Sequence, residues 1–297
     1  MAEPRYLLIC GLGYAGRAVA RCALAQGWRV SGTARDPGAR AGDAPPDVTV
    51  IGFDAAGGAL ASATHLLVTA APGDAGDPVM LAHRAGVLSA PRLVWIGYLS
   101  TTGVYGDRGG AWVDEETPAA PGQDRSRRRV AAEQAWRDLA GASGRALDIF
   151  RIGGIYGPGR SAIDDLRAGT LRHRVIKPGH AFGRIHRDDI ALAVLAAAAQ
   201  TPGCPTRILN IVDDEPAESA VVVEEAARLL GIAPPPALPF EEAVLRMSPM
   251  ARGFWAESRR VSNARTKSVL GITWHYPTFR EGLRAILRGD DANATKS

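Results

Sequence analysis

The feature that most constrains this chain is a glycine-rich turn near its start, Gly11-Leu12-Gly13-Tyr14-Ala15-Gly16. The apolar run Tyr6 to Cys10 before it is typical of a buried strand, and the alanine-rich stretch Arg17 to Gln26 after it is typical of a helix. In a dinucleotide-binding site the first glycine permits the tight turn, the second lets the backbone approach a pyrophosphate, and the third lets the helix pack against the strand. The phosphates then lie at the helix N-terminus. The alternative is an ordinary turn, because the chain has 34 glycines.

Short apolar runs and helical stretches alternate through the first third of the chain. Strands are expected at Arg29 to Ala34, Val48 to Phe53, His65 to Ala70 and Leu93 to Ile96, with a helix from Pro78 to Ser89. Strands separated by helices predict crossover connections and a parallel sheet covered on both faces. We therefore expect an α/β fold, a Rossmann-type doubly wound parallel sheet.

Length and composition bound the classes of protein to which the chain can belong. It has 297 residues, 46% of them hydrophobic, and a formal net charge of +4, which fits one large domain or a main domain with a smaller lobe. The arginines are scattered except at Arg125 to Arg129, which argues against a nucleic-acid partner. No apolar run approaches the roughly 20 residues needed to cross a bilayer, and Tyr6 to Cys10 is far shorter than a signal-peptide core. We expect a cytoplasmic protein with a small-molecule substrate and no membrane partner, and a homodimer is left open.

The three cysteines, Cys10, Cys22 and Cys204, are widely spaced and form no Cys-x-x-Cys pair. This spacing argues for a reducing compartment and against a structural zinc site. No metal site is expected.

The end of the second expected strand bears on the choice of cofactor. NAD sites usually carry Asp or Glu there to hold the ribose 2′-hydroxyl, whereas a 2′-phosphate requires a cation. Here the strand runs into Arg35, and no acid occurs before Asp36. Because Arg35 offers paired donors to a phosphate, NADP is favoured over NAD. The alternative is that Arg35 faces solvent beside Asp36.

Four further segments resemble, in the same order, those of the extended short-chain dehydrogenases/reductases, the nucleotide-sugar epimerase and dehydratase group. They are Tyr98 to Asp107, Arg151 to Gly159, Gly183 to Ala191 and Leu209 to Pro216. The resemblance implies NAD(P)-dependent oxidoreductase or epimerase/dehydratase chemistry on a carbonyl or hydroxyl of a small, nucleotide-sugar-like substrate. It also implies a single domain over residues 1–297, with a smaller C-terminal substrate lobe built mainly from 156–186 and 213–288.

The catalytic pair of this family is not retained. In the family, a Tyr-x-x-x-Lys pair precedes a common Glu, the tyrosine acts as acid or base, and the lysine lowers its pKa and holds the nicotinamide ribose. With Glu133 placed on that Glu, Arg125 stands at the tyrosine position and Arg129 at the lysine position, and Cys10 replaces the first glycine of the family's loop. These departures resemble an atypical, YeeZ-like subgroup that keeps the binding loop without the tyrosine. A non-catalytic NADP(H)-sensing regulatory protein is therefore the alternative function.

Several side chains near these motifs are candidates for roles in the site. Thr101 aligns with the family's catalytic Ser/Thr and could bond a substrate oxygen, or it could cap the loop after its strand. Tyr105 is a nearby phenol, for which a catalytic role competes with a structural one. Arg129 shares a helix face with Arg125 and could bind ribose or phosphate, or form part of a solvated basic face. His186 is expected to order its loop and cap the next helix rather than to transfer protons.

The expected cofactor site combines the glycine loop with residues that follow the other strands or match the family. Its members are Gly11, Leu12, Gly13, Tyr14, Ala15, Gly16, Arg35, Asp54, Ala70, Ala71, Pro72, Ser100, Arg129 and Ile152. The carboxyl ends of parallel strands meet at one edge of a sheet, so these residues are expected to gather there.

Overall fold

The computed structural model describes residues 5–200 and 206–289, and Cys204 lies outside the described residues. By the grouping of its internal contacts the chain divides into two compact units. The first unit comprises Met1–Thr101, Asp124–Arg151 and Ile190–Leu209. The second unit comprises Thr102–Gln123, Ile152–Asp189 and Asn210–Ser297.

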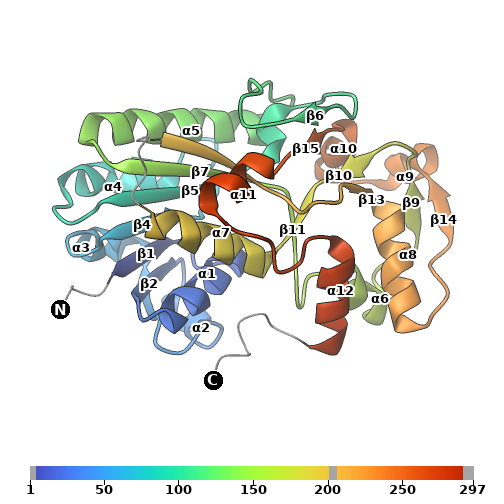
Figure 1. The fold of residues 1–297 in the computed structure, drawn as a ribbon, viewed down its shortest axis with the longest axis horizontal. Coiled ribbons are helices and arrows are strands. Elements are labelled where there is room, and N and C mark those ends of the chain that lie inside the picture. Colours follow the sequence, from blue (N-terminus) through green and yellow to red (C-terminus); the bar gives the residue numbers. More distant parts are fainter. Residues whose placement is uncertain (1–4, 201–205, 290–297) are drawn as a thin grey trace. The chain divides into compact units, whose positions relative to one another are not determined.

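The first unit is organised around a seven-stranded sheet with the order β12-β7-β5-β4-β1-β2-β3 (Figure 1). The strands are β1 (Tyr6–Cys10), β2 (Arg29–Ala34), β3 (Thr49–Gly52), β4 (His65–Val68), β5 (Trp95–Thr101), β7 (Ala146–Ile152) and β12 (Thr206–Ile211). Pairing is parallel between β1 and both β2 and β4, between β2 and β3, and between β4 and β5. The predicted Rossmann-type α/β fold is confirmed.

The fifth strand differs from its expected position. The apolar run predicted a strand over Leu93 to Ile96, whereas β5 begins at Trp95 and continues to Thr101. Its last residues include Ser100, which is buried although it is polar. The strand tolerates this hydroxyl because the Glu133 carboxylate accepts its hydrogen bond at 2.6 Å.

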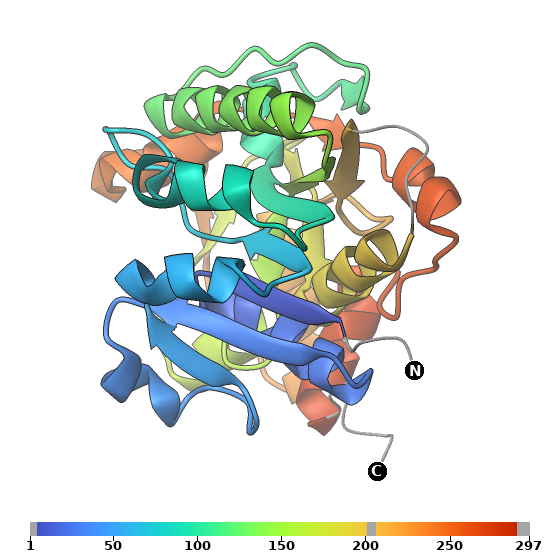
Figure 2. The ribbon, with the colours of Figure 1, turned by 90° about the vertical axis from the view of Figure 1, so that its left-hand side faces the viewer.

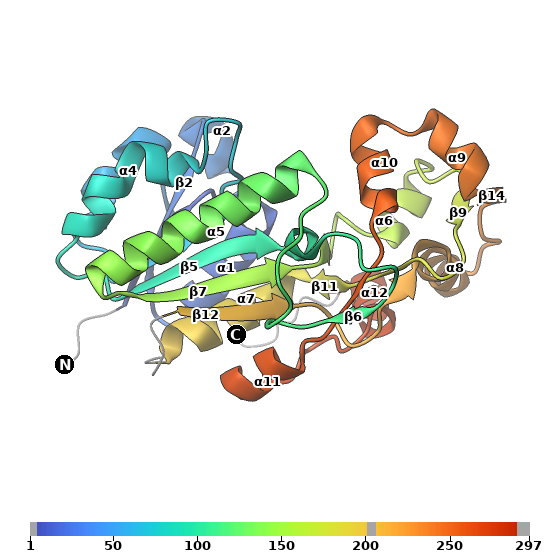
Figure 3. The same cartoon turned by 90° about the horizontal axis from the view of Figure 1, so that it is seen from above.

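Helices cover both faces of this sheet (Figure 2). On one face lie α3 (Ala56–Leu60), α4 (Pro78–Ser89) and α5 (Asp124–Ser143), and on the other lie α1 (Tyr14–Ala25) and α7 (Arg187–Ala199). Figure 3 shows α5 lying along β5 and β7. A Cβ at Gly16 would lie 3.3 Å from Ile9 Cγ2, which places α1 against the Ile9 face of β1. On the same face, the ring of His65 forms a 3.2 Å hydrogen bond with the Ala198 carbonyl of α7.

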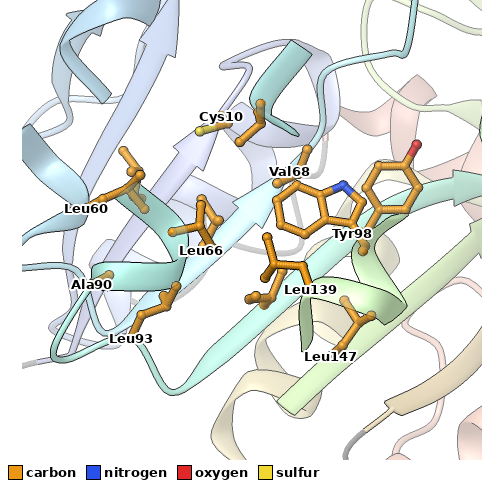
Figure 4. Close-up of a cluster of buried hydrophobic side chains, with 14 of the residues drawn as sticks. Cys10, Leu60, Leu66, Val68, Ala90, Leu93, Tyr98, Leu139 and Leu147 are labelled. Atoms are coloured by element: carbon orange, nitrogen blue, oxygen red, sulfur yellow. The ribbon is translucent and has the colours of Figure 1, made fainter. Parts of the chain in front are cut away.

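The core on the α3, α4 and α5 face is continuous and apolar (Figure 4). Cys10 lies in it, close to Val68 of β4, with its thiol fully buried. Burial raises the pKa of this thiol to about 12, so it stays protonated at neutral pH and acts as a small apolar side chain. The residue that replaces the family's first glycine is therefore a core residue.

The second unit consists of short elements. Its helices are α6 (Ala162–Arg167), α8 (Ser219–Leu230), α9 (Phe240–Arg246), α10 (Pro249–Ala256), α11 (Ala264–Leu270) and α12 (Phe279–Arg288), and the short helix η2 spans Thr102–Tyr105. Its strands form the pairs β6 (Trp112–Val113) with β15 (Arg260–Val261), β8 (Gly154–Tyr156) with β11 (Arg184–His186), β9 (Arg174–Ile176) with β14 (Ala237–Pro239), and β10 (Ala181–Phe182) with β13 (Ala217–Glu218).

Helix α12 shows how this unit obtains its core. Thr278 and Glu281 form a capping box at its N-terminus, which satisfies backbone N–H groups that the helix itself leaves unpaired. Phe279, Leu283 and Ile286 recur at helical spacing and are buried against α6 and α8. A stripe of apolar residues on one short helix thus closes the apolar cluster of the unit.

The described part of the chain comprises residues 5–200 and 206–289. No helix in this part of the chain is both long enough and apolar enough to cross a membrane. No group of three or more His, Cys, Asp or Glu side chains in the same part is arranged to hold a metal ion.

Candidate functional site

The three glycines of the loop have three different physical roles. Gly11 has φ of +108°, a conformation that favours glycine, and a Cβ there would approach Thr69 Oγ1 to 2.6 Å. A Cβ on Gly16 would approach the Gly11 carbonyl oxygen to 2.7 Å, so only glycine lets α1 lie this close to β1. A Cβ on Gly13 would meet no described atom within 4 Å. The protein's own packing therefore requires Gly11 and Gly16, whereas Gly13 keeps the space beside the turn clear.

Two threonines hold the loop in place, and sequence reasoning missed both. Gly11 N–H donates to Thr33 Oγ1 at 3.0 Å, and Leu12 N–H donates to the Thr33 carbonyl at 2.8 Å. On the other side the Thr69 hydroxyl donates to the Gly11 carbonyl. The signal that could have found them is a hydroxyl residue near the carboxyl end of each strand that neighbours β1.

The start of α1 is suited to an anion. Gly13 is its N-cap, no side chain among the described residues caps the helix, and the first turn contains no acid. The partial positive charge of a helix N-terminus is therefore not offset by a carboxylate. Together with the open space at Gly13, this arrangement fits a pyrophosphate.

Arg35 and Asp36 differ in their surroundings. Asp36 Oδ1 accepts the Ala39 N–H at 3.1 Å, at the start of α2 (Pro37–Ala41). Arg35 is exposed just beyond the carboxyl end of β2, and within residues 5–200 and 206–289 it makes no hydrogen bond or ion pair. The carboxylate therefore has a local capping role, while the cation is directed into solvent.

The other predicted cofactor contacts follow β3 and β4. Ala70 lies against the loop, since a Cβ on Gly11 would come within 3.0 Å of its backbone nitrogen. Ala71 is exposed and Pro72 half-buried in the segment that continues from Ala70. Asp54 is exposed in the short helix η1 (Phe53–Ala55) after the edge strand β3. Their contacts with a cofactor stay predictions.

Ser100 belongs to a buried charged network. Its hydroxyl donates to Glu133 Oε1, and Arg151 of β7 donates to both oxygens of the same carboxylate, at 3.2 and 2.8 Å. All three side chains are buried, so the arginine neutralises a carboxylate that would otherwise be costly in the core. The Ser100 hydroxyl is therefore used for a hydrogen bond within the protein.

Arg129 ties α5 to the carboxyl ends of two strands. Its Nη1 donates to the Leu99 carbonyl at 2.8 Å, to the Tyr98 hydroxyl at 3.0 Å and, at the 3.5 Å limit, to the Ala70 carbonyl. Its Nε and Nη2 make no hydrogen bond with the described residues. The side chain that stands at the family's lysine position therefore links α5 to the ends of β4 and β5, and two of its nitrogens are unbonded within the described residues.

Arg125 is exposed one helical turn before Arg129. The neighbouring arginines form ion pairs, Arg127 with Asp124 and Arg128 with Asp74. No hydrogen bond or ion pair of Arg125 occurs in the described part of the chain. The side chain at the family's tyrosine position is therefore a solvated cation that forms no ion pair with the described residues.

Of the two predicted catalytic residues, Thr101 is the more accessible. It is half-buried at the end of β5. Tyr105 is fully buried in the second unit, and its hydroxyl donates to Asn210 Oδ1 at 2.8 Å, which favours its structural role. Ile152, the last residue of β7, is also buried. His186 Nδ1 accepts the Asp188 N–H at 3.2 Å at the start of α7, which is the capping role expected for it.

Asp77 is a buried acid near Arg129 that sequence reasoning did not select. Its Oδ1 accepts the N–H groups of Val79 and Met80 at the start of α4, and its Oδ2 accepts the indole N–H of Trp136 at 3.3 Å. Burial raises the pKa of this carboxyl, while the hydrogen bonds and Arg129 oppose the shift. An Asp followed by Pro is a usual helix start, and this pattern could have indicated its capping role.

Comparison with known sequences finds relatives that match different lengths of this chain. The Escherichia coli K12 protein YeeZ is 29% identical over 245 residues, which are 76% of this chain and 84% of YeeZ. A Streptomyces protein named 3-diazoavenalumate denitrifying reductase is 32% identical over 154 residues, which are 49% of this chain and 47% of the reductase. The match therefore spans about half of that reductase. No family model matches the chain.

Solved structures share the fold over nearly the whole chain. A conserved protein of unknown function from Silicibacter pomeroyi is 40% identical, with a TM-score of 0.87 and coverage of 96% of this chain and 99% of that one. The UDP-glucose 4-epimerase of Thermus thermophilus, solved in complex with NAD, is 20% identical, with a TM-score of 0.74 and coverage of 96% and 99%. At this lower identity the likeness concerns the fold alone.

Proposed function

Because the chain belongs to the extended short-chain dehydrogenase/reductase family, in its atypical YeeZ-like subgroup, we propose that it is an NADP(H)-dependent oxidoreductase. Its substrate is a small molecule with a carbonyl or hydroxyl group. The observation that carries this proposal is the glycine loop, in which Gly11 and Gly16 are required by packing while Gly13 keeps space clear at the start of α1. Nicotinamide dinucleotides carry hydride chemistry that side chains do not supply.

The residues that would hold the cofactor come from the first unit. The backbone of Gly11 to Gly16 would receive the pyrophosphate, Arg35 the 2′-phosphate, and Nε and Nη2 of Arg129 a ribose or phosphate oxygen. Asp36 is already engaged by the Ala39 N–H, which supports a site for NADP rather than NAD. The Thermus thermophilus epimerase that shares the fold was solved with NAD, and titration with both cofactors decides between them.

The reacting group would lie beside Thr101, whose hydroxyl would bond its oxygen. When bound, the cofactor supplies or accepts a hydride, and in reduction the carbonyl oxygen takes its proton from water or from the substrate. The first unit offers a cation, Arg125, and not a phenol at the place where the family carries its acid or base. An arginine stays protonated at neutral pH and so cannot act as that base. The proposed enzyme therefore depends on hydride transfer with the cofactor and on the positioning of the substrate oxygen by Thr101.

The relative named 3-diazoavenalumate denitrifying reductase supports the reductive direction. Its name describes a reductase whose substrate is a diazo compound. Reduction of that kind does not require a tyrosine acid at a sugar hydroxyl. The name of this relative therefore supports a small reducible substrate.

The cofactor assignment is tested by fluorescence titration with NADPH and NADH. We expect NADPH to bind more tightly, and Arg35→Ala to remove at least tenfold of that preference. Arg29→Ala is the matched control, because Arg29 is an exposed arginine at the opposite end of the same strand. Equal affinity for both cofactors, or no effect of Arg35→Ala, would refute the role of Arg35.

The role of Arg129 needs a variant that separates binding from positioning. Arg129→Ala is expected to weaken NADPH binding about tenfold, whereas Arg127→Ala, on the same helix, leaves it unchanged. Arg129→Lys keeps one cation and is expected to restore part of the affinity. If Arg129→Ala binds NADPH as the wild type does, the ligand contact is wrong and the side chain only holds β4 and β5 together.

A second candidate function is a non-catalytic sensor of the NADP(H) state. The observation that favours it is Arg125 in the tyrosine's place, with Tyr105 buried and bonded to Asn210. NADPH oxidation against a panel of aldehydes, ketones and sugar nucleotides separates the two functions. Turnover supports the oxidoreductase, and tight NADPH binding without any turnover supports the sensor.

A further inference from the structure

The N-terminal part of α5 is rich in arginine, and one of these arginines has no use in the proposed cofactor site. Four of the first six residues of the helix are arginines. Arg127 and Arg128 form the ion pairs described above, and Arg129 donates to backbone carbonyls at the ends of β4 and β5. Arg125 is exposed and makes no hydrogen bond or ion pair within residues 5–200 and 206–289. An exposed cation is ordinarily a solvated surface residue, so its position decides whether it can have a ligand.

Arg125 lies on the side of α5 that packs against the sheet. Successive residues of an α-helix are about 100° apart around its axis, which places Arg125 between Ala132 and Trp136, about 20° from each. Both of these residues are buried in the core of the first unit. The exposure of Arg125 therefore results from its position along the helix and not from a solvent-facing side.

The direction of α5 relative to β5 follows from the C-terminal end of the helix. The helix ends at Ser143, and shortly after it the Ala146 N–H donates to the Val94 carbonyl, which immediately precedes β5. Helix α5 therefore runs back along β5, from the carboxyl end of that strand toward its amino end (Figure 3). The first turn of α5, which contains Arg125, is at the edge of the sheet where the strands end.

Arg125 and Thr101 are at a similar level along this direction. Arg129 Nη1 donates to the Leu99 carbonyl at 2.8 Å. Arg125 is one helical turn, about 6 Å, nearer the start of α5, and Thr101 is two residues, about 7 Å, further along β5. Because the helix and the strand run in opposite directions, these two steps point the same way. The Arg125 side chain is therefore at the end of β5, beside Thr101, where the reacting group of the substrate is proposed to lie.

This position suits the substrate better than the pyrophosphate of the cofactor. The pyrophosphate is proposed to lie at the glycine loop, which follows β1. The sheet order β5-β4-β1 separates that loop from the end of β5 by two strand spacings, about 10 Å. Arg125, Thr101 and these three strands all belong to the first unit. The cation is therefore available to a charged group of the substrate.

The chemistry of arginine defines the group that Arg125 would bind. Its guanidinium stays protonated at neutral pH, and its planar fork of N–H donors matches the two oxygens of a carboxylate. A phosphate carries more than one negative charge at neutral pH, whereas the other arginines of this part of α5 already have protein partners. A single carboxylate balances the one charge of Arg125. These properties favour a carboxylate over a phosphate.

We propose that Arg125 binds a carboxylate of the substrate, close to the carbonyl whose oxygen Thr101 would bond. This rests on the proposed oxidoreductase function and narrows its substrate class to small oxo acids. At the place where the family carries its acid or base, this chain would then have a residue that selects the substrate and transfers no proton.

Binding to the full chain, alone and with saturating NADP⁺, is measured by calorimetric titration. The probes are 2-oxobutanoate, 4-oxopentanoate, the neutral amide of each acid, and dihydroxyacetone phosphate. We expect at least one acid to bind at least about tenfold more tightly than its amide, because the amide cannot form the charge-assisted pair of hydrogen bonds. Equal affinity for acids and amides would overturn the proposal, and so would tighter binding of dihydroxyacetone phosphate than of either acid. The absence of acid binding up to about 10 mM would overturn it too.

Two substitutions of one residue assign the preference for acids to Arg125. Arg125→Gln is expected to lower the ratio of acid to amide affinity to less than about threefold, and Arg125→Lys, which keeps the charge without the planar fork, to restore only part of it. The matched control is Arg84→Gln on α4. Arg84 is also an exposed arginine of the first unit, and it makes no hydrogen bond or ion pair with the described residues. An unchanged ratio in Arg125→Gln, or an equal loss in Arg84→Gln, would overturn the proposal.

Titration of the same variants with NADPH separates this inference from the proposed function. If NADPH binds the wild type and the variants equally while acids and amides bind alike, the substrate class is wrong and the cofactor assignment stands. If the acids bind as expected and NADPH does not bind at all, the carboxylate site stands but the proposed oxidoreductase is refuted. If Arg125→Gln weakens NADPH binding as much as acid binding, Arg125 contacts the cofactor and the inference is wrong.

Discussion

The Ser100 hydroxyl donates a 2.6 Å hydrogen bond to Glu133, and this bond joins the end of β5 to the middle of α5. Glu133 also receives two hydrogen bonds from Arg151 of β7. One buried carboxylate therefore connects a helix with two strands at the edge of the sheet where the cofactor is proposed to bind. The geometry of that edge depends on a charged network and not on apolar packing alone.

Removal of this carboxylate takes away the ion-pair partner of the buried Arg151 guanidinium. Glu133→Ala is expected to lower the free energy of unfolding by about 3–5 kcal/mol, because Arg151 remains charged in the core. Urea unfolding followed by circular dichroism measures the change. Asp138→Ala, at an exposed position of the same helix, is the control and should cost less than about 0.5 kcal/mol. The double variant Glu133→Leu with Arg151→Met should regain most of the lost stability. A cost under about 1 kcal/mol for Glu133→Ala would contradict an important role of the network in stability.

The threonine that holds the glycine loop should affect binding more than folding. Thr33→Val keeps the shape of the side chain and removes the acceptor of the Gly11 N–H. We expect a loss of about 1–2 kcal/mol of stability and about tenfold of NADPH affinity, because the loop loses its register beside β2. Thr49→Val, on an exposed position of β3, is the matched control for both measurements. Wild-type affinity in Thr33→Val would show that the loop keeps its geometry without this bond.

Alanine substitutions at Gly13 and Gly16 of the loop are expected to differ in their effects on stability and on NADPH binding. Gly13→Ala should fold with wild-type stability, within about 0.5 kcal/mol, since its backbone is extended and its Cβ meets nothing. The same methyl group should weaken NADPH binding at least tenfold by occupying the phosphate space. Gly16→Ala should instead destabilise the fold by about 1–3 kcal/mol, because its Cβ lies 2.7 Å from the Gly11 carbonyl. Thermal unfolding and NADPH titration of both variants test the assignment, and a Gly13→Ala variant that binds normally contradicts it.

The sheet could be predicted from the sequence because each of its first strands is a local apolar run followed by a turn or a helix start. The boundary of β5 could not, since the burial of Ser100 depends on Glu133, which lies 33 residues away. For the same reason the roles of Thr33 and Thr69 could not be predicted, because their hydrogen-bond partners lie in the loop after a different strand. Arg129 was found only through its position in a family motif, and its bonds to Leu99 and Ala70 follow from the fold. Local patterns thus predicted the elements, while the contacts that hold the site depend on residues distant in the sequence.

In the second unit, the buried carboxyl of Asp213 is expected to make the stability of the protein depend on pH. Asp213 is 2% exposed, and neither of its oxygens has a hydrogen-bond partner among the described residues. Burial raises the pKa of this carboxyl to about 8, although Arg184 opposes the shift, and Asp214 and Glu215 add to it. A second buried acid, Asp189, has its pKa raised to about 7, also by burial.

The sign of the effect follows from proton binding. An unfolded Asp loses its proton near pH 4, whereas the folded Asp213 keeps it until about pH 8, so the folded state binds more protons between these values. Stability is therefore greatest at the acidic end of this window and falls as pH rises, by up to about 1.4 kcal/mol per pH unit from this group. Asp213→Asn cannot ionise and should flatten the fall between pH 5 and 8, leaving the part due to Asp189. Urea unfolding at pH 5, 6, 7 and 8 measures the slope, with Asp138→Asn as the exposed control. An unchanged slope in Asp213→Asn would mean that Asp213 ionises in the folded protein as it does in water.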